Sequence, residues 1–241
     1  MLSEDRARES VIIALDCARD EAISLADSLS GRACWVKVGM TLFYAEGPSI
    51  VSEMHRRGLK VFLDLKLHDI PFQVRGAARS ASLAGADILS IHGMGSAEMV
   101  AQARAGVEEA AGHRAGQRTR LVAISVLTSM SQESLEEIGV TLPLEEEVAR
   151  LAALSVGAGS DGIVCSPREA SDMRCRLGEA ALIVTPGVRP AGSELGDQRR
   201  VSTPASAIAA GASMLVLGRP ITRAQDPAGA FEGIVRELVE G

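Results

Sequence analysis

The sequence predicts a single α/β domain over residues 1–241, folded as a (β/α)₈ TIM barrel. Eight short apolar runs rich in β-branched residues recur along the chain, and alanine-rich segments with helical periodicity separate them. Strand followed by helix, repeated with parallel crossovers, is typical of this barrel. A doubly wound open sheet would show a similar alternation, but no Gly-x-Gly-x-x-Gly follows the first run. Nor does a linker, low-complexity tract or charge block divide the chain.

Each predicted strand is too short for a typical helix and too apolar for a loop. In order, the strands cover residues 11–16, 35–39, 60–66, 87–92, 121–126, 162–165, 181–185 and 214–218. Helices are expected between them, for example over 20–29 and 47–57, where apolar residues recur at helical spacing. Glycines follow several of these segments, as is common at a helix C-terminus; they are Gly58, Gly85, Gly159 and Gly211.

Two connections are longer than packing requires. Residues 131–147 carry Pro143 and the glutamate run 145–147, and we expect an extra surface helix there, with the glutamates on a solvated face. Residues 187–200 are rich in glycine and arginine, which predicts a lid over a bound anion.

Composition excludes several classes of protein. The formal net charge is -6, from 25 Lys+Arg against 31 Asp+Glu, which argues against nucleic acid as the main partner. No apolar run reaches the ~18 residues of a membrane span, so no membrane partner is expected. The cysteines form no Cys-x-x-Cys pair, so neither a zinc site nor a redox motif is predicted, and we expect small buried apolar groups at Cys17, Cys34, Cys165 and Cys175. Residues 1–10 alternate charges where a secretory signal needs an apolar stretch, which favours a cytoplasmic location.

The third predicted strand carries charges where a core should be. Because side chains alternate along a strand, its leucines at 63, 65 and 67 share one face, while Asp64 and Lys66 share the other with Phe62 and His68. The leucines must face the outer helices, so Asp64 and Lys66 point into the barrel near its C-terminal end. Asp16 ends the first strand and Lys37 lies on the second. The first three strands therefore place four charged side chains at the same end of the barrel.

A charge taken out of water costs several kcal/mol unless it is paired, so this arrangement needs a reason. One alternative is a structural ion-pair network, but four charges on the catalytic face of this architecture favour catalysis. Carboxylates on either side favour the charged form of a lysine, which disfavours a Schiff-base nucleophile. They favour instead a cation that stabilises a developing carbanion and then protonates it. The charges supply their own counter-ions, so no metal is expected.

A second group of residues ends the last two strands. The segments are Thr185-Pro186-Gly187-Val188-Arg189 and Gly218-Arg219-Pro220. In this fold, the loops after strands seven and eight often bind phosphate. Gly218 lets the backbone approach the anion, and Arg219 offers a guanidinium fork. The alternative is that Arg219 caps a helix or forms a surface ion pair.

These motifs resemble those of the orotidine 5′-phosphate decarboxylase family. Asp64-Leu65-Lys66-Leu67-His68-Asp69-Ile70-Pro71 is similar to the family signature Asp-x-Lys-x-x-Asp-Ile-Pro. The resemblance extends over essentially the whole chain, through Ala14-Leu15-Asp16, Lys37-Val38-Gly39, Val126-Leu127-Thr128-Ser129-Met130, the two segments above and Gly196-Asp197-Gln198-Arg199-Arg200.

The resemblance implies cofactor-free decarboxylation of orotidine 5′-monophosphate to uridine 5′-monophosphate. Lys66 would donate the proton to C6, Asp64 would lie beside the departing carboxylate, and Lys37 and Asp16 would bind ribose hydroxyls. Asp69 would reach into the site of a neighbouring subunit, which implies a homodimer with composite active sites. Further substrate-binding residues would be Ile70, Gln73, Thr128, Arg189, Gln198, Gly218 and Arg219.

One departure from the family pattern concerns the ribose. The family usually continues Ile-Pro-Asn-Thr, with the threonine contacting a ribose hydroxyl, whereas this chain has Phe72 and Gln73. The longer glutamine puts that contact in doubt. Other functions remain open: a lyase acting on a sugar phosphate, with or without a metal, or a catalytically silent barrel that binds nucleotides.

Two histidines and two aromatic residues near the predicted strands are assigned structural rather than catalytic roles. His92, at the end of the fourth strand, is interpreted as a hydrogen-bonded residue behind the site, without contact to ligand. His68 is interpreted as orienting a turn. Trp35 and Phe62 are expected to pack the barrel interior, because that space must be filled.

Overall fold

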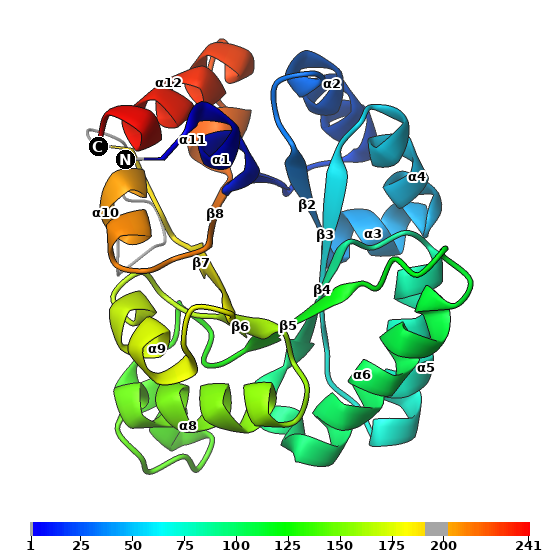
Figure 1. Ribbon diagram of the computed structural model, residues 1–241, viewed down its shortest axis with the longest axis vertical. Coiled ribbons are helices and arrows are strands. Elements are labelled where there is room, and N and C mark those ends of the chain that lie inside the picture. The colour runs from blue at the N-terminus through cyan, green and yellow to red at the C-terminus, as the bar shows by residue number, and fades with distance from the viewer. Residues whose placement is uncertain (1, 191–201) are drawn as a thin grey trace.

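The computed structural model describes residues 2–190 and 202–241, which form a closed barrel of eight parallel strands in sequence order (Figure 1). The predicted (β/α)₈ architecture is confirmed. The strands are β1 (Val11–Leu15), β2 (Trp35–Gly39), β3 (Lys60–Leu67), β4 (Ile88–His92), β5 (Arg120–Ile124), β6 (Gly162–Val164), β7 (Leu182–Pro186) and β8 (Met214–Leu217). Each predicted strand overlaps one of these, and no end differs by more than two residues.

Helices surround the barrel on its outside (Figure 1). They are α1 (Glu4–Glu9), α2 (Arg19–Leu29), α3 (Met40–Glu46), α4 (Ser49–Arg56), α5 (Pro71–Leu83), α6 (Ser96–Ala111), α7 (Gln132–Glu137), α8 (Leu144–Gly157), α9 (Ala170–Leu177), α10 (Pro204–Ala209), α11 (Arg219–Thr222) and α12 (Pro227–Glu240), with a short 3₁₀ turn η1 (Gly93–Gly95). The two ends of the chain meet, because the Leu2 amide donates to the Leu238 carbonyl at 3.3 Å.

The strands separate two apolar layers. Inside the barrel, Trp35 and Phe62 pack with Ile88 and Val122, so the prediction that the two aromatic residues fill the interior is confirmed. Outside, Leu63 and Leu65 pack with residues of the surrounding helices. The leucines of β3 therefore face outward as predicted, and the alternate positions of the strand face inward.

β3 departs from regular geometry near its end. It pairs with β4 through Leu63↔Leu89 and Leu67↔Ile91, so β3 carries more residues than β4 over this stretch, a β-bulge. Within the bulge, Lys66 has a φ of 51°, in the left-handed region that residues with a side chain rarely occupy. The sequence contains no glycine or turn signal here, and the bulge was not predicted.

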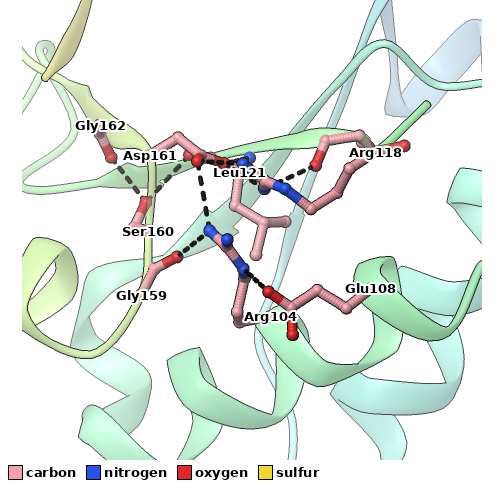
Figure 2. Close-up of polar contacts among 9 residues, drawn as sticks. Arg104, Glu108, Arg118, Leu121, Gly159, Ser160, Asp161 and Gly162 are labelled. Atoms are coloured by element: carbon pink, nitrogen blue, oxygen red, sulfur yellow. Dashed lines mark hydrogen bonds and ion pairs between the residues drawn. The ribbon is translucent and has the colours of Figure 1, made fainter. Parts of the chain in front are cut away.

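At the N-terminal end of the barrel, Asp161 ties β5 to β6 (Figure 2). Its carboxylate accepts two hydrogen bonds from Arg118, at 2.7 and 2.6 Å, and one from the Leu121 amide at 2.7 Å. Arg104 adds a third cationic contact at 3.2 Å. A structural ion-pair network therefore joins β5 and β6 at this end of the barrel, opposite the end where Asp64 and Lys66 lie.

Two expectations about single residues are wrong. The extra helix in the 131–147 connection is present as α7. Glu145 and Glu146 are exposed as expected, but Glu147, in the first turn of α8, is buried and pairs with Arg150 at 2.6 Å. Of the cysteines expected to be buried, Cys165 is buried, Cys17 and Cys34 are only partly buried, and Cys175 is exposed near the end of α9. In residues 2–190 and 202–241, no helix is both long and apolar enough to cross a bilayer.

Candidate active site

The charged side chains of the first three strands meet at the C-terminal end of the barrel. Nζ of Lys37 lies 2.8 Å from Oδ1 of Asp16 and 3.7 Å from Oδ2 of Asp64. Nζ of Lys66 lies 2.8 Å from the same Oδ2 of Asp64. The four residues form one continuous chain of alternating charges, Asp16–Lys37–Asp64–Lys66, which we call the charge array. The structure thus brings these four predicted residues together.

The array is not uniformly buried. The side chains of Lys37 and Asp64 are each 11% exposed and that of Lys66 is 29% exposed, whereas that of Asp16 is 67% exposed. The expectation that all of these charges are withdrawn from water is therefore wrong for Asp16. It lies one residue beyond the end of β1, on the rim, where solvent reaches it.

Asp64 is the most enclosed acid of the array. Burial alone would raise its pKa, but the charges of Lys37 and Lys66, together with hydrogen bonds from Lys66 and Ser90, hold the pKa of Asp64 below its ordinary value. Asp64 is therefore a carboxylate at neutral pH. The array then carries two negative and two positive charges, so it is balanced without an added ion.

Two residues that support the array were not predicted from the sequence. Ser90, on β4, donates to Oδ1 of Asp64 at 2.7 Å and accepts from the amide of Lys66 at 2.8 Å. Gly39, at the end of β2, leaves room for the Lys37–Asp16 pair, since a Cβ there would lie 3.2 Å from Nζ of Lys37. Strand alternation offered a signal for Ser90, because it shares the inward-facing positions of β4 with Ile88.

Two adjoining cavities open beside the array. The smaller, about 190 Å³, is lined by Lys66, Asp64, Thr128 and apolar side chains that include Phe62 and Val164. The larger, about 410 Å³, is lined by Asp16 and by backbone and side chains of the loops after β7 and β8. Lys37, Pro186 and Val216 line both cavities. Together they form an elongated site, with a mostly apolar end at Lys66 and a polar end at the last two strands.

The polar end contains the residues predicted to bind phosphate. Arg189, Gly218 and Arg219 all line the larger cavity, and Arg223 joins them. Arg189 is buried and donates to the Val188 carbonyl at 2.8 Å, whereas Arg219 is exposed at the first position of α11. Gln198, also predicted to bind substrate, lies outside the residues that the structure describes, as does most of the predicted lid over 187–200.

Three predicted site residues lie apart from the array. Asp69, Ile70 and Gln73 are exposed on the loop after β3 and the first turn of α5. Oδ1 of Asp69 accepts the Ile70 amide at 2.7 Å, and none of the three lines either cavity. Within one chain, then, the structure does not bring them to the site.

His68 and His92 stack beside the site, with ring centroids 5.2 Å apart. Burial, together with the charges of His68 and Lys66, lowers the pKa of His92, so it is neutral at physiological pH. Nδ1 of His92 accepts the Met94 amide at 3.4 Å, which agrees with the interpretation of a satisfied residue. Among the described residues, no group of three or more His, Cys, Asp or Glu side chains is placed to hold a metal ion.

Comparisons with known proteins agree with the geometry. The family model described as "Orotidine 5'-phosphate decarboxylase / HUMPS family" matches residues 9–234. The orotidine 5′-phosphate decarboxylase of Alkalilimnicola ehrlichii is 51% identical over 229 residues, 95% of each chain. That of Geobacter sulfurreducens is 44% identical over 241 residues and the whole of both chains. The crystal structure of orotidine 5′-phosphate decarboxylase from Lactobacillus acidophilus matches with a TM-score of 0.84 at 37% identity, covering 95% of this chain and 98% of that one.

Proposed function

Because the chain belongs to the orotidine 5′-phosphate decarboxylase / HUMPS family, we propose that it decarboxylates orotidine 5′-monophosphate to uridine 5′-monophosphate. The observation that carries this assignment is the charge array at the junction of the two cavities. A nucleoside monophosphate has an anionic end and a flat, partly apolar base, and the elongated site offers a matching environment for each.

The phosphate occupies the polar cavity. Arg219 and Arg189 supply cationic hydrogen-bond donors there, and the Gly218 segment supplies backbone at the start of α11. Gln198 is proposed to join them. Binding energy at this end is remote from the reacting carbon, so it can be used to orient the base against Lys66.

The pyrimidine occupies the smaller cavity, with Thr128 at its polar edge. In the reaction, the bond between C6 and the carboxylate breaks, carbon dioxide leaves, and the electron pair stays on C6. Lys66 then transfers a proton from Nζ to C6, and a proton from solvent restores the ammonium group. The charge of Lys66 stabilises the developing carbanion before the transfer, so one group serves both steps.

Asp64 and Lys37 position this proton donor. Oδ2 of Asp64 lies 2.8 Å from Nζ of Lys66 and orients the end of this side chain. A substrate carboxylate bound next to Asp64 is repelled while it carries its charge, and the repulsion falls as carbon dioxide departs. Lys37 and Asp16, at the wall shared with the polar cavity, are placed to bind ribose hydroxyls.

We infer that two copies of the chain associate through the rim formed by β2, β3 and β4. Exposed apolar side chains follow these neighbouring strands, and Phe72 and Tyr44 are 79% and 71% exposed; the others are Met40, Ile70 and Met94. Covering such side chains is favourable. Asp69 lies among them, so association would carry it, with Ile70 and Gln73, to the partner's site. We also assign the protein to the cytoplasm, a reducing compartment that suits its free cysteines.

The direct test follows the absorbance of the orotate chromophore after micromolar protein is added to orotidine 5′-monophosphate. We expect loss of the signal and stoichiometric uridine 5′-monophosphate, identified by chromatography. No change in absorbance would contradict the proposal. Turnover of a sugar phosphate without a pyrimidine, dependent on magnesium, would instead support the alternative lyase function. Binding of uridine 5′-monophosphate without decarboxylation would indicate a silent nucleotide-binding barrel.

A further inference from the structure

We propose that Ser90 is a positioning residue that sets the Lys66 ammonium and the Asp64 carboxylate in their reactive arrangement. This inference rests on the decarboxylase function proposed above and adds a residue that neither the signature motif nor the cavity linings include. Ser90 is fully buried on β4, so substrate does not touch it. It acts through the two β3 residues that it contacts.

The Ser90 hydroxyl makes a hydrogen bond with each of them. It donates to Oδ1 of Asp64 at 2.7 Å and accepts the Lys66 amide at 2.8 Å. Oδ2, the other oxygen of Asp64, receives Nζ of Lys66. One serine therefore holds the backbone of the proposed proton donor and the carboxylate that orients the end of its side chain. This closes a ring of hydrogen bonds through Ser90, Asp64 and Lys66.

The backbone of Lys66 needs such support. Its φ of 51° is one that an L-residue with a side chain adopts rarely, and the pairing of β3 with β4 shifts around it. In a regular strand, the amide of a residue facing the next strand pairs with a backbone carbonyl. At Lys66, where the register shifts, the amide donates to the Ser90 hydroxyl. Without the hydroxyl, the amide would lose this partner and the bulge could relax.

Two other buried hydroxyls near this end of the barrel make a different contact. Ser125, just after β5, donates to the Val164 carbonyl at 3.0 Å, and Thr185 on β7 donates to the Met214 carbonyl at 3.3 Å. Both bonds join a strand to its neighbour. The Ser90 hydroxyl instead donates to a charged side chain of the array. If Ser90 only joined β4 to β3, its hydroxyl would not need to donate to the charged Asp64 side chain.

The test compares Ser90→Ala with Ser160→Ala. Ser160 is also buried, but it lies at the N-terminal end of the barrel, where its hydroxyl donates to the carbonyls of Leu121 and Gly162 at 3.1 and 2.7 Å (Figure 2). Both variants lose a buried hydroxyl, and only the first touches the array. We expect Ser90→Ala to lower kcat roughly 10-fold to 100-fold, because small displacements of reacting groups have large effects on rate. Its KM, and its Kd for uridine 5′-monophosphate, should change less than about threefold.

Two more variants separate positioning from packing. Ser90→Thr keeps the hydroxyl, and we expect its kcat to stay within about fivefold of the wild type. Ser90→Cys keeps nearly the same volume but forms weaker hydrogen bonds, so its kcat should fall close to that of the alanine variant without a cavity being formed.

Three results would overturn the proposal. They are a kcat for Ser90→Ala within threefold of Ser160→Ala, equal losses in the threonine and alanine variants, or a loss of nucleotide affinity that parallels the loss of kcat. A failure of the proposed function itself looks different, because the wild-type protein would then leave orotidine 5′-monophosphate unchanged.

Discussion

Nζ of Lys66 lies 2.8 Å from Oδ2 of Asp64, and Nζ of Lys37 lies 3.7 Å from the same oxygen. One carboxylate oxygen thus faces two ammonium groups in a place where little water reaches. The buried charges of Lys37 and Asp64 would each be costly alone, and each is stabilised by its neighbours. The position of Nζ on Lys66 is therefore determined by partners from β2 and β4 as well as by its own strand.

Lys66→Ala should abolish decarboxylation while leaving the fold intact. We expect kcat to fall by at least about 10³-fold, because the proton donor and the cation that stabilises the carbanion are removed together. Orotate absorbance measures the rate, and calorimetry with uridine 5′-monophosphate checks that nucleotide still binds. Lys60→Ala is the matched control, since Lys60 starts the same strand at the opposite end of the barrel and pairs with Glu9. A rate near that of the wild type for Lys66→Ala would remove the role assigned to this lysine.

Gly39→Ala should impair the site without unfolding the protein. The added methyl group would lie 3.2 Å from Nζ of Lys37 and 3.3 Å from Oδ1 of Asp16, so the pair must shift. We expect kcat/KM to fall about tenfold and the thermal midpoint to change little. Gly233→Ala, in α12 with open space around it, serves as the control. Equal kinetics for the two alanine variants would show that the array tolerates displacement.

Mixing two inactive variants should restore activity if the sites are shared between subunits. Lys66→Ala and Asp69→Ala, unfolded and refolded together, form mixed dimers in which one site has both residues intact. Random pairing of subunits predicts about a quarter of the wild-type activity for a symmetric dimer. Sedimentation velocity checks that the species is a dimer.

Lys66→Ala mixed with Asp64→Ala provides the control for this experiment. Both changes lie in the same subunit's half of the site, so no mixed dimer contains an intact site, and activity should stay absent. If the first mixture also stays inactive although dimers form, Asp69 does not act across the interface.

Asp161→Asn should destabilise the barrel in a pH-dependent way. Burial alone would raise the pKa of Asp161, but hydrogen bonds from Arg118 and Leu121 and the charges of Arg118 and Arg104 hold it below its ordinary 3.8. A carboxyl group with a lowered pKa in the folded state stabilises that state above its unfolded pKa. The stabilisation is lost as pH falls through the folded value. We expect the variant to lose about 1–2 kcal/mol of unfolding free energy at pH 7.

Urea titrations at pH 7 and pH 3 measure this effect. The difference in unfolding free energy between wild type and Asp161→Asn should narrow at pH 3, because that pH lies below the ordinary pKa of 3.8 and the unfolded wild type has taken up a proton on Asp161. Asp172→Asn is the control, because its pair with Arg176 is more than half exposed and should contribute little. If the difference in unfolding free energy is the same at both pH values, the network in Figure 2 is not stabilised by the charge of Asp161.

Much of the molecule could be predicted from local patterns. The strands of the barrel, the outward-facing leucines of β3 and the meeting of Asp16, Lys37, Asp64 and Lys66 all follow from alternation along parallel strands. The glycines at 58, 85, 159 and 211 end helical segments with positive φ values, as their position suggested. These features depend on residues close in the sequence, which is why sequence patterns reveal them.

Other features depend on strands that lie far apart in the sequence, so tertiary structure alone decided them. The bulge at Lys66 depends on the register between β3 and β4, and so does the contact between the Lys66 amide and Ser90. Only the position of β1 beside β2 shows that a side chain at residue 39 would meet Asp16. The sequence by itself determined which charges reach the mouth of the barrel, through a two-residue period along each strand. Folding decided how exposed each charge is and which buried hydroxyl holds it, because those depend on the distances between strands.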